Sequence, residues 1–225
     1  MSGVARPTRA LPQGPLRLAL SRGALFEPTL DLLDRIEVDT RELRGESRSL
    51  IFETGELVVV TMRPSDVPTY VEAGAADLGI TGKDVLMEQA DRVFYELLDL
   101  GYGGCRMVLA GPAGDDRLEE HARRLGVLRI ATKYPRIAER FFEDTGRRAE
   151  VIEVKGSVEL APVSGLADAI VDLVDTGRTL RDNGLVVREE IVHSTARLIG
   201  NRVAHNLRAK EIDELSARLR AEAGA

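Results

Sequence analysis

Two aspartates beside a glycine turn form the most informative cluster in the chain. In the stretch AIVDLVDTGRTL, Asp172 and Asp175 accompany an apolar run, and residues Thr176 to Thr179 follow directly. Gly177 permits a tight turn, and the free N–H groups of a short helix opening at Thr179 would point towards an anion such as phosphate. Because carboxylates repel phosphate, we expect the two aspartates to bind sugar hydroxyls or Mg²⁺, and the combination indicates a sugar phosphate.

The apolar run before the turn predicts the element that must position these groups. Residues Ala169 to Val174 are mostly β-branched or compact, which is typical of a buried strand in a parallel sheet. Asp172 and Asp175 then lie at or near the C-terminal end of the strand, where open α/β sheets bind their ligands. An ordinary Asp-Thr-Gly turn is the alternative, since these residues are common wherever a strand leads into a helix.

Three junctions in the chain share one design, a hydroxyl, a glycine and a cation between a predicted strand and a predicted helix. They are Ser21-Arg22-Gly23, Thr81-Gly82-Lys83 and Thr176-Gly177-Arg178. None of them matches the P-loop or the dinucleotide fingerprint. Three such turns exceed what one phosphate needs, so the pattern favours a ligand or ligand pair that is rich in phosphate.

Strands and helices alternate along the chain, which predicts an α/β fold with parallel sheets covered on both faces. Strands are expected at LRLALS (16–21), ELVVVTM (56–62), ADLGIT (76–81), CRMVLA (105–110), LRIATK (128–133) and AEVIEV (149–154). Helices are expected at residues 24–33, 63–74, 83–90, 135–146 and 209–223. In the last of these, the spacing of Ile212, Leu215 and Leu219 indicates core packing. No internal repeat is expected.

Composition excludes several classes of function. The 225 residues carry 31 basic and 37 acidic side chains, and the net charge of -6 argues against a general nucleic-acid binder. Cys105 is the only cysteine, so no internal disulfide can form and a reducing cytoplasm is expected. No apolar run reaches the roughly 20 residues of a membrane span. Residues 1–15 lack the apolar core of a signal peptide and predict a flexible tail.

The segment Glu159 to Leu180, ELAPVSGLADAIVDLVDTGRTL, resembles the signature of the ATP phosphoribosyltransferases, the family that begins histidine biosynthesis. The matching positions are Glu159, Gly165, Ala167, Ile170, Asp172, Leu173, Thr176, Gly177, Thr179 and Leu180. SRSLIF, RPSDVPTYVEAGAADLGITGKDVL, DLGYGGCRMVLA and RIATKYP resemble further family segments in the same order. The resemblance covers almost the whole chain after the tail. It is to the short form of the family, which lacks the regulatory C-terminal domain of the long form.

The resemblance implies two α/β domains around a cleft, like those of type II periplasmic binding proteins. The first, on the ATP side, would comprise residues 16–103 and 185–225. The second, which binds phosphoribosyl pyrophosphate (PRPP), would comprise residues 104–184.

The resemblance also implies a reaction, in which N1 of ATP attacks the anomeric carbon of PRPP with inversion and pyrophosphate leaves. Mg²⁺ would accompany these substrates. An oxocarbenium-like transition state makes nearby carboxylates useful, as well as a cation on the pyrophosphate. By the family pattern the 5-phosphate would be bound by Thr176, Gly177, Arg178 and Thr179. The ribose would be bound by Glu159, Asp172 and Asp175. Catalysis would depend on Asp172, Asp175 and Arg63.

Arg63 is the cation expected on the leaving pyrophosphate, and Arg22 and Arg48 are further candidates for phosphate contacts. Lys83 and Asp99 could face the nucleotide. The structural alternative for the three arginines is a surface arginine paired with an acid, and for Lys83 and Asp99 it is a helix cap or a solvated charge. The family commonly has Lys-Gly-Arg-Leu after the first strand, whereas this chain has Arg-Gly-Ala-Leu at 22–25, so ATP contacts at that turn are expected to differ.

The short form implies a homodimer that gains regulation from a separate subunit resembling histidyl-tRNA synthetase, in a hetero-octamer. Two rival functions stay open at this point. A solute-binding protein would share the architecture, although the missing export signal and the phosphate turn argue against it. A salvage-type phosphoribosyltransferase would share the sugar donor, but it normally has one main domain and a different base pocket.

Overall fold

The computed structural model describes residues 14–45, 48–114 and 126–223, and these form two compact units. The first unit contains the chain up to Thr81, the segment Arg92–Leu100 and the chain from Arg197 onwards. The second unit contains Gly82–Asp91 and Gly101–Ala196. Of the predicted flexible tail at residues 1–15, residues 1–13 lie outside the described residues. The carbonyls of Gly14 and Pro15 accept hydrogen bonds from the Arg208 guanidinium at 2.7 and 3.5 Å, so these two residues are held in place.

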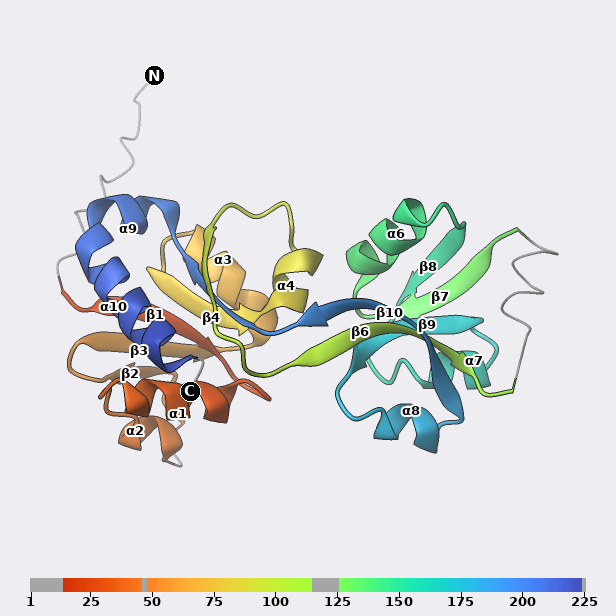
Figure 1. The fold of residues 1–225 in the computed structure, drawn as a ribbon, viewed down its shortest axis with the longest axis horizontal. Coiled ribbons are helices and arrows are strands. Elements are labelled where there is room, and N and C mark those ends of the chain that lie inside the picture. The colour runs from red at the N-terminus through yellow and green to blue at the C-terminus, as the bar shows by residue number, and fades with distance from the viewer. Residues whose placement is uncertain (1–13, 46–47, 115–125, 224–225) are drawn as a thin grey trace, which may run out of the picture. The chain divides into compact units, whose positions relative to one another are not determined.

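The first unit is built on a six-stranded sheet of order β2-β3-β1-β4-β11-β5 (Figure 1). Its strands are β1 (Leu16–Ser21), β2 (Ile51–Glu53), β3 (Leu57–Met62), β4 (Leu78–Gly82), β5 (Tyr95–Asp99) and β11 (Ala196–Gly200). β1 pairs in parallel with β3 and β4, while β2 and β5 are antiparallel to their neighbours. Its helices are α1 (Phe26–Arg35), α2 (Arg41–Arg44), the 3-10 helix η1 (Pro64–Asp66), α3 (Val67–Glu72), α9 (Arg202–Leu207) and α10 (Ala209–Glu222).

The second unit is built on a five-stranded sheet of order β10-β6-β9-β7-β8 (Figure 1). Its strands are β6 (Cys105–Pro112), β7 (Leu128–Thr132), β8 (Ala149–Glu153), β9 (Ala169–Val174) and β10 (Leu185–Ser194). Its helices are α4 (Lys83–Glu88), α6 (Pro135–Asp144), α7 (Leu160–Val163) and α8 (Arg178–Asp182). β8, β7 and β9 run in parallel, whereas β6 is antiparallel to β9 and β10 is antiparallel to β6.

The α/β class is therefore confirmed, but the prediction of wholly parallel sheets is wrong. β6 explains the error, because Met107, Val108 and Ala110 are fully buried although the strand is antiparallel to both of its neighbours. A strand buried on both faces has the continuous apolar sequence that is usual in parallel sheets, and that sequence does not specify direction.

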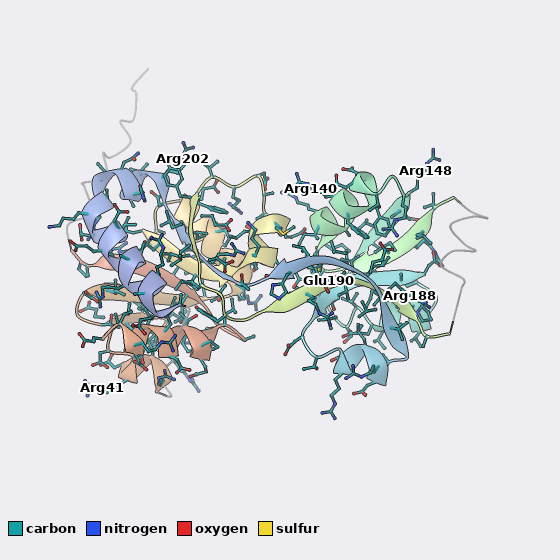
Figure 2. The ribbon with its side chains drawn as sticks, viewed as in Figure 1. Arg41, Arg140, Arg148, Arg188, Glu190 and Arg202 are labelled. Carbon is teal, nitrogen blue, oxygen red and sulfur yellow. The ribbon has the colours of Figure 1, made fainter. Side chains whose placement is uncertain are left out.

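The two units also differ from the predicted domain bounds at residues 82–91, 101–103 and 185–196, all of which belong to the second unit. Residues 185–196 belong to the second unit because β10 pairs with β6 over its whole length, from Leu185 opposite Pro112 to Ser194 opposite Cys105. Side chains reinforce this pairing, since Arg188 and Glu190 on β10 reach the carbonyl of Pro112 and the side chain of Arg106 (Figure 2).

Residues 82–91 also belong to the second unit, because polar contacts fix α4 there. The Glu88 carboxylate accepts hydrogen bonds from the backbone N–H groups of Arg136 and Ile137, both at 3.1 Å, and so caps α6 from another element. The Ser194 hydroxyl donates to the buried Asp84 carboxylate at 2.8 Å. These contacts join residues far apart in the sequence, so no local pattern predicts them.

In each sheet, an aspartate makes the same two hydrogen bonds at the start of a parallel strand pair. In the first sheet Asp77 accepts a hydrogen bond from the N–H of Arg17 on its carboxylate, and its own N–H donates to the Arg17 carbonyl, both at 2.9 Å. In the second sheet Asp168 makes the same two bonds with Arg129, at 2.9 and 2.8 Å. Each aspartate directly precedes a buried strand, β4 or β9, and aligns it with the strand beside it.

The C-terminal helix packs into the first unit as its sequence predicts. Ile212, Leu215 and Leu219 of α10 are buried, which confirms the expected core packing. In the part of the chain that the structure describes, no helix has the length and apolar character needed to cross a membrane.

Asn201 joins three elements of the first unit. Its side-chain oxygen caps α9 by accepting from the N–H groups of Val203 and Ala204, both at 2.9 Å. Its side-chain nitrogen donates to the carbonyls of Val71 and Glu72, at 2.7 and 3.2 Å, at the end of α3. The residue is only 6% exposed, and its bonds to Val71 and Ala204 are fully buried.

We expect Asn201→Asp to destabilise the protein, although aspartate is normally as good a cap as asparagine. The carboxylate would keep the cap on α9, but it would lose both donors and face two buried carbonyls. We expect a loss of about 2–4 kcal/mol in the free energy of unfolding, measured by urea denaturation. The exposed Asn206→Asp is the matched control and should change stability by less than about 0.5 kcal/mol. Equal stability of the two variants would contradict this role of Asn201.

Candidate functional site

The junction between β9 and α8 forms a tight turn around a left-handed glycine. β9 ends at Val174, and Gly177 adopts a φ of 70° as the N-cap residue of α8. The backbone N–H of Arg178 lies 3.4 Å from the hydroxyl oxygen of Thr176. Asp175, Thr176, Arg178 and Thr179 are exposed. Exposed hydroxyls and a helix start therefore follow directly after a buried strand, as the sequence predicts.

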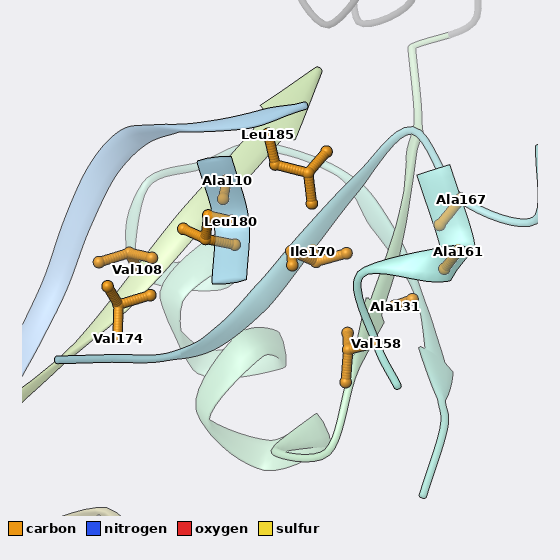
Figure 3. Close-up of a cluster of buried hydrophobic side chains, with 10 residues drawn as sticks. All are labelled: Val108, Ala110, Ala131, Val158, Ala161, Ala167, Ile170, Val174, Leu180 and Leu185. Carbon is orange, nitrogen blue, oxygen red and sulfur yellow. The ribbon is translucent and has the colours of Figure 1, made fainter. Parts of the chain in front are cut away.

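A cluster of buried apolar side chains contains the residues on both sides of this turn, Val174 and Leu180 (Figure 3). Ile170 and Val174 of β9 pack in this cluster with Leu180 of α8, and each of them is at least 95% buried. Leu180 thus attaches the short helix to the sheet, two residues after the exposed Arg178. The cluster also contains Val158, which fixes the chain just before α7. The polar residues of the site are held by their apolar neighbours in the sequence.

The turn lines a cavity of about 150 Å³ within the second unit. Glu159 reaches it from the N-cap position of α7, and the other lining residues come from β9, the turn and α8. The lining residues are Glu159, Asp172, Leu173, Val174, Asp175, Thr176, Gly177, Arg178, Thr179 and Leu180. All seven residues that are expected to bind PRPP therefore border one cavity, which is lined both by three carboxylate residues and by the turn at the start of α8.

Asp172 is the buried member of the three carboxylates. It is 9% exposed, and burial raises the pKa of its carboxyl above the usual value. A hydrogen bond from the N–H of Leu173 at 2.9 Å and the charge of Lys133 lower this pKa, while the charge of Glu159 raises it further. The register explains the influence of Lys133, because Thr132 lies opposite Val171 in the parallel pair β7 and β9. Lys133 and Asp172 are the next residues along these two strands.

The predicted ATP-side residues do not line this cavity. Arg22, Arg48, Arg63 and Asp99 belong to the first unit. Arg22 donates to the hydroxyl of Thr61 at 3.0 Å and to the carbonyl of Ser49 at 3.5 Å.

Arg48 and Arg63 are exposed, and Arg63 directly precedes η1. Asp99 at the end of β5 forms an ion pair with Arg197 at 2.7 Å, so it has a structural partner within the first unit. Lys83 begins α4 in the second unit, where its backbone N–H donates to the carbonyl of Thr195.

Two cations near the cavity are not among the residues predicted from the sequence. Lys133 acts on Asp172 from the neighbouring strand, and Arg181 donates from its guanidinium to the carbonyl of Thr176 at 3.2 Å. Arg181 has a sequence signal, because it lies four residues after Gly177 and so returns to the same side of a helix. Lys133 has none beyond its place at the end of a predicted strand, because strand order cannot be read from one sequence.

Comparison with known proteins identifies relatives over most of the chain. The family model described as ATP phosphoribosyltransferase matches residues 63–221. An ATP phosphoribosyltransferase of Rubrobacter xylanophilus is 52% identical over 203 residues, which cover 90% of this chain and 94% of that protein. The solved ATP phosphoribosyl transferase (HisG:HisZ) complex from Thermotoga maritima contains a chain that is 34% identical, with a TM-score of 0.77 and coverage of 93% and 98%.

More distant structures confirm the expected fold class. The periplasmic aliphatic sulphonate binding protein SsuA from Escherichia coli has a TM-score of 0.59 at 14% identity, over 94% of this chain and 69% of that one. At this identity the likeness concerns the fold alone.

We expect Gly177→Ala to destabilise the turn. A side chain at φ 70° costs about 1–2 kcal/mol, and the added Cβ would lie 3.3 Å from a guanidinium nitrogen of Arg181. Gly184→Ala has the same backbone strain at φ 69° but meets nothing within 4 Å. Urea denaturation should show a lower free energy of unfolding in both variants. NMR titration with inorganic phosphate should show weaker phosphate binding in Gly177→Ala alone. Gly156→Ala has neither strain nor a close contact, so a Gly177→Ala as stable as Gly156→Ala would contradict the assignment.

We also expect Asp172→Asn to stabilise the protein at neutral pH. Folding raises the pKa of the Asp172 carboxyl, so the protonated carboxyl favours the folded state. This stabilisation is complete below the unfolded pKa of about 3.9 and is lost as the pH rises through the pKa of the folded state. The asparagine stays neutral, so its advantage in the free energy of unfolding should be largest at pH 7–8 and should vanish towards pH 4. Urea denaturation across this range measures it, with the exposed Asp144→Asn as control. A variant that is less stable than the wild type at pH 7 would refute this electrostatic account.

Proposed function

The chain belongs to the ATP phosphoribosyltransferase family, and we propose that its β9–α8 cavity binds PRPP for transfer of the 5-phosphoribosyl group to N1 of ATP. This reaction releases pyrophosphate and is the first step of histidine biosynthesis. The observation that carries the proposal is the meeting of Glu159, Asp172 and Asp175 with the turn 176–179 around one cavity.

The residues that line the cavity offer groups for both the phosphate and the sugar of a sugar phosphate. Thr176 and Thr179 offer exposed hydroxyls, and the start of α8 offers free N–H groups, which suit the 5-phosphate. The carboxylates of Asp172, Asp175 and Glu159 are acceptors for the ribose hydroxyls. Arg178 is exposed on the turn and adds a positive charge on the phosphate side.

The carboxylates would also act on the reacting ring. As the bond from the anomeric carbon to pyrophosphate breaks and the bond to N1 forms, positive charge grows on the ring, and a nearby carboxylate stabilises that charge. N1 of neutral adenine already holds a lone pair, so the attack requires no proton removal. For Arg63 we propose stabilisation of the negative charge that develops on the departing pyrophosphate.

Mg²⁺ in this proposal comes with the substrates. Magnesium is usually held by one or two carboxylates together with substrate phosphates, and Asp172 and Asp175 are suitable carboxylates. For the nucleotide we propose Arg22, Arg48 and Lys83 as contacts, with Asp99 less favoured because Arg197 already pairs with it. We propose the cytoplasm as the site of the reaction, in keeping with the biosynthetic role of the relatives.

We expect Asp172→Asn and Asp175→Asn to lower kcat by about 10²-fold, because each variant removes a negative charge that acts mainly in the transition state. The assay follows pyrophosphate release at saturating PRPP and ATP. The matched control is Asp144→Asn, on the exposed surface of α6 and outside the cavity. If both variants kept the kcat of the wild type, the proposed role of the carboxylates would be wrong. Pyrophosphate release with free nucleobases in place of ATP would instead indicate a salvage-type enzyme.

We also propose that the chain is a homodimer by itself and that it acquires histidine regulation from a second subunit resembling histidyl-tRNA synthetase, in a hetero-octamer. The support is the Thermotoga maritima structure, which is a complex of two proteins, HisG and HisZ, and whose matching chain is covered over 98% of its length. Light scattering should give the mass of a dimer, and histidine should leave pyrophosphate release by the purified chain unchanged. Strong, saturable inhibition without a second protein would refute the proposal.

A further inference from the structure

Arg181 bonds the turn at residues 176–179, the phosphate turn, through both its backbone and its side chain. Its backbone N–H donates to the carbonyl of Gly177 at 3.2 Å. Its guanidinium donates to the carbonyl of Thr176, also at 3.2 Å. One residue therefore engages two consecutive carbonyls of the turn, although it does not line the cavity.

A second side chain completes the pattern at the carbonyl of Thr179. Asn183 donates to this carbonyl from its side-chain amide at 2.9 Å and from its backbone N–H at 3.2 Å. The carbonyls of Thr176, Gly177 and Thr179 are thus all bonded to donors that come later in the chain. Carbonyl oxygens carry partial negative charge and would repel a phosphate. Because these carbonyls already accept hydrogen bonds from Arg181 and Asn183, the N–H groups and hydroxyls of the turn are the groups that an anion would meet.

The glycine at 177 makes room for this contact. A Cβ on Gly177 would lie 3.3 Å from the guanidinium nitrogen of Arg181, closer than ordinary van der Waals contact. Gly184 has nearly the same φ with open space around it, so strain alone does not distinguish the two glycines. Gly177 and Arg181 are therefore coupled, because the guanidinium reaches the turn across the place where a side chain would stand.

Arg178, the other arginine next to the turn, is arranged differently. Its guanidinium lies 3.6 Å from the carboxylate of Asp182, and both side chains are mostly exposed. Such a pair contributes little to the order of the backbone. Arg181 is the arginine that bonds the backbone of the turn.

We propose that Arg181 is a positioning residue for the 5-phosphate subsite, where it fixes the turn so that a sugar phosphate meets donors and not carbonyls. This inference rests on the proposed function and adds to it a residue outside the cavity lining. The planar guanidinium supplies both the directed hydrogen bond and a fixed positive charge beside the turn. The ligand class is a phosphate monoester dianion on a pentose.

The test measures binding of ribose 5-phosphate by calorimetry and steady-state kinetics with PRPP. We expect Arg181→Gln to weaken ribose 5-phosphate binding and to raise KM for PRPP by about tenfold, the usual effect of losing a charge-assisted contact. Its kcat at saturating PRPP should stay within about threefold of the wild type, because the residue acts before the chemical step. Arg181→Lys should recover part of the affinity, since it keeps the charge but not the planar fork.

Arg188→Gln is the matched control. Arg188 on β10 (Figure 2) also donates to a backbone carbonyl, that of Pro112, and neither residue lines the cavity. It should leave ribose 5-phosphate binding unchanged. A double variant, Gly177→Ala with Arg181→Gln, should lose less affinity than the product of the two single losses, because both changes remove the same contact. Binding by Arg181→Gln within twofold of Arg188→Gln, or fully multiplicative losses in the double variant, would overturn the proposal.

Hydrogen exchange of the ligand-free chain separates this proposal from the proposed function. Arg181→Gln should speed exchange at the backbone N–H groups of Arg181, Asn183 and Gly184, which donate to carbonyls of the turn and of α8, at least fivefold relative to Arg188→Gln. If the wild type bound neither PRPP nor ribose 5-phosphate, the proposed function would fail, and the exchange rates alone would decide whether Arg181 orders the turn. Equal rates in the two variants would overturn the role of Arg181 whether or not sugar phosphates bind.

Discussion

The site depends on a carboxylate held in an otherwise apolar strand. β9 must bury Ile170, Val171 and Val174 to form the core of the second unit, and Asp172 lies among them. The same burial that stabilises the sheet raises the pKa of Asp172 and removes its carboxylate from competing water. A carboxylate in this setting interacts strongly with any positive charge that develops beside it, because the surrounding dielectric is low. Function and stability therefore place opposite demands on one residue.

Buried apolar residues on both sides of the turn hold its backbone in place. Leu180 anchors α8 in the same cluster as Val174, so the exposed residues between them have little freedom. Val158 does the same for Glu159 at the start of α7. Apolar neighbours one or two positions away thus hold the polar groups of the cavity, in addition to the hydrogen bonds that Arg181 and Asn183 make to the turn. Substitutions in this apolar cluster would disturb ligand binding although none of its side chains carries charge.

Much of this was predictable from the sequence where the signal is local. The strand Leu16–Ser21 has the predicted bounds, and the cluster from Asp172 to Thr179 lies at the end of a buried strand as expected. The failures concern contacts between distant residues. Strand direction for β6 depends on its partners, the place of residues 82–91 depends on Glu88 and Asp84, and the partner of Asp99 is almost a hundred residues away. Arg181 was missed although its spacing of four residues from Gly177 is visible in the sequence, because the backbone carbonyl that its side chain bonds carries no signal in side-chain types.

Asp77 and Asp168 stand in similar stretches of sequence, although no internal repeat was expected. LRLALS at residues 16–21 corresponds to LRIATK at 128–133, and GAADLGI at 74–80 corresponds to GLADAIV at 165–171. The strand registers agree as well, with Leu18 opposite Leu78 and Ile130 opposite Ala169. In this alignment Thr81 is the counterpart of Asp172. The two sheets thus share the aspartate that precedes the strand and differ further along it, where β9 carries a carboxylate of the cavity.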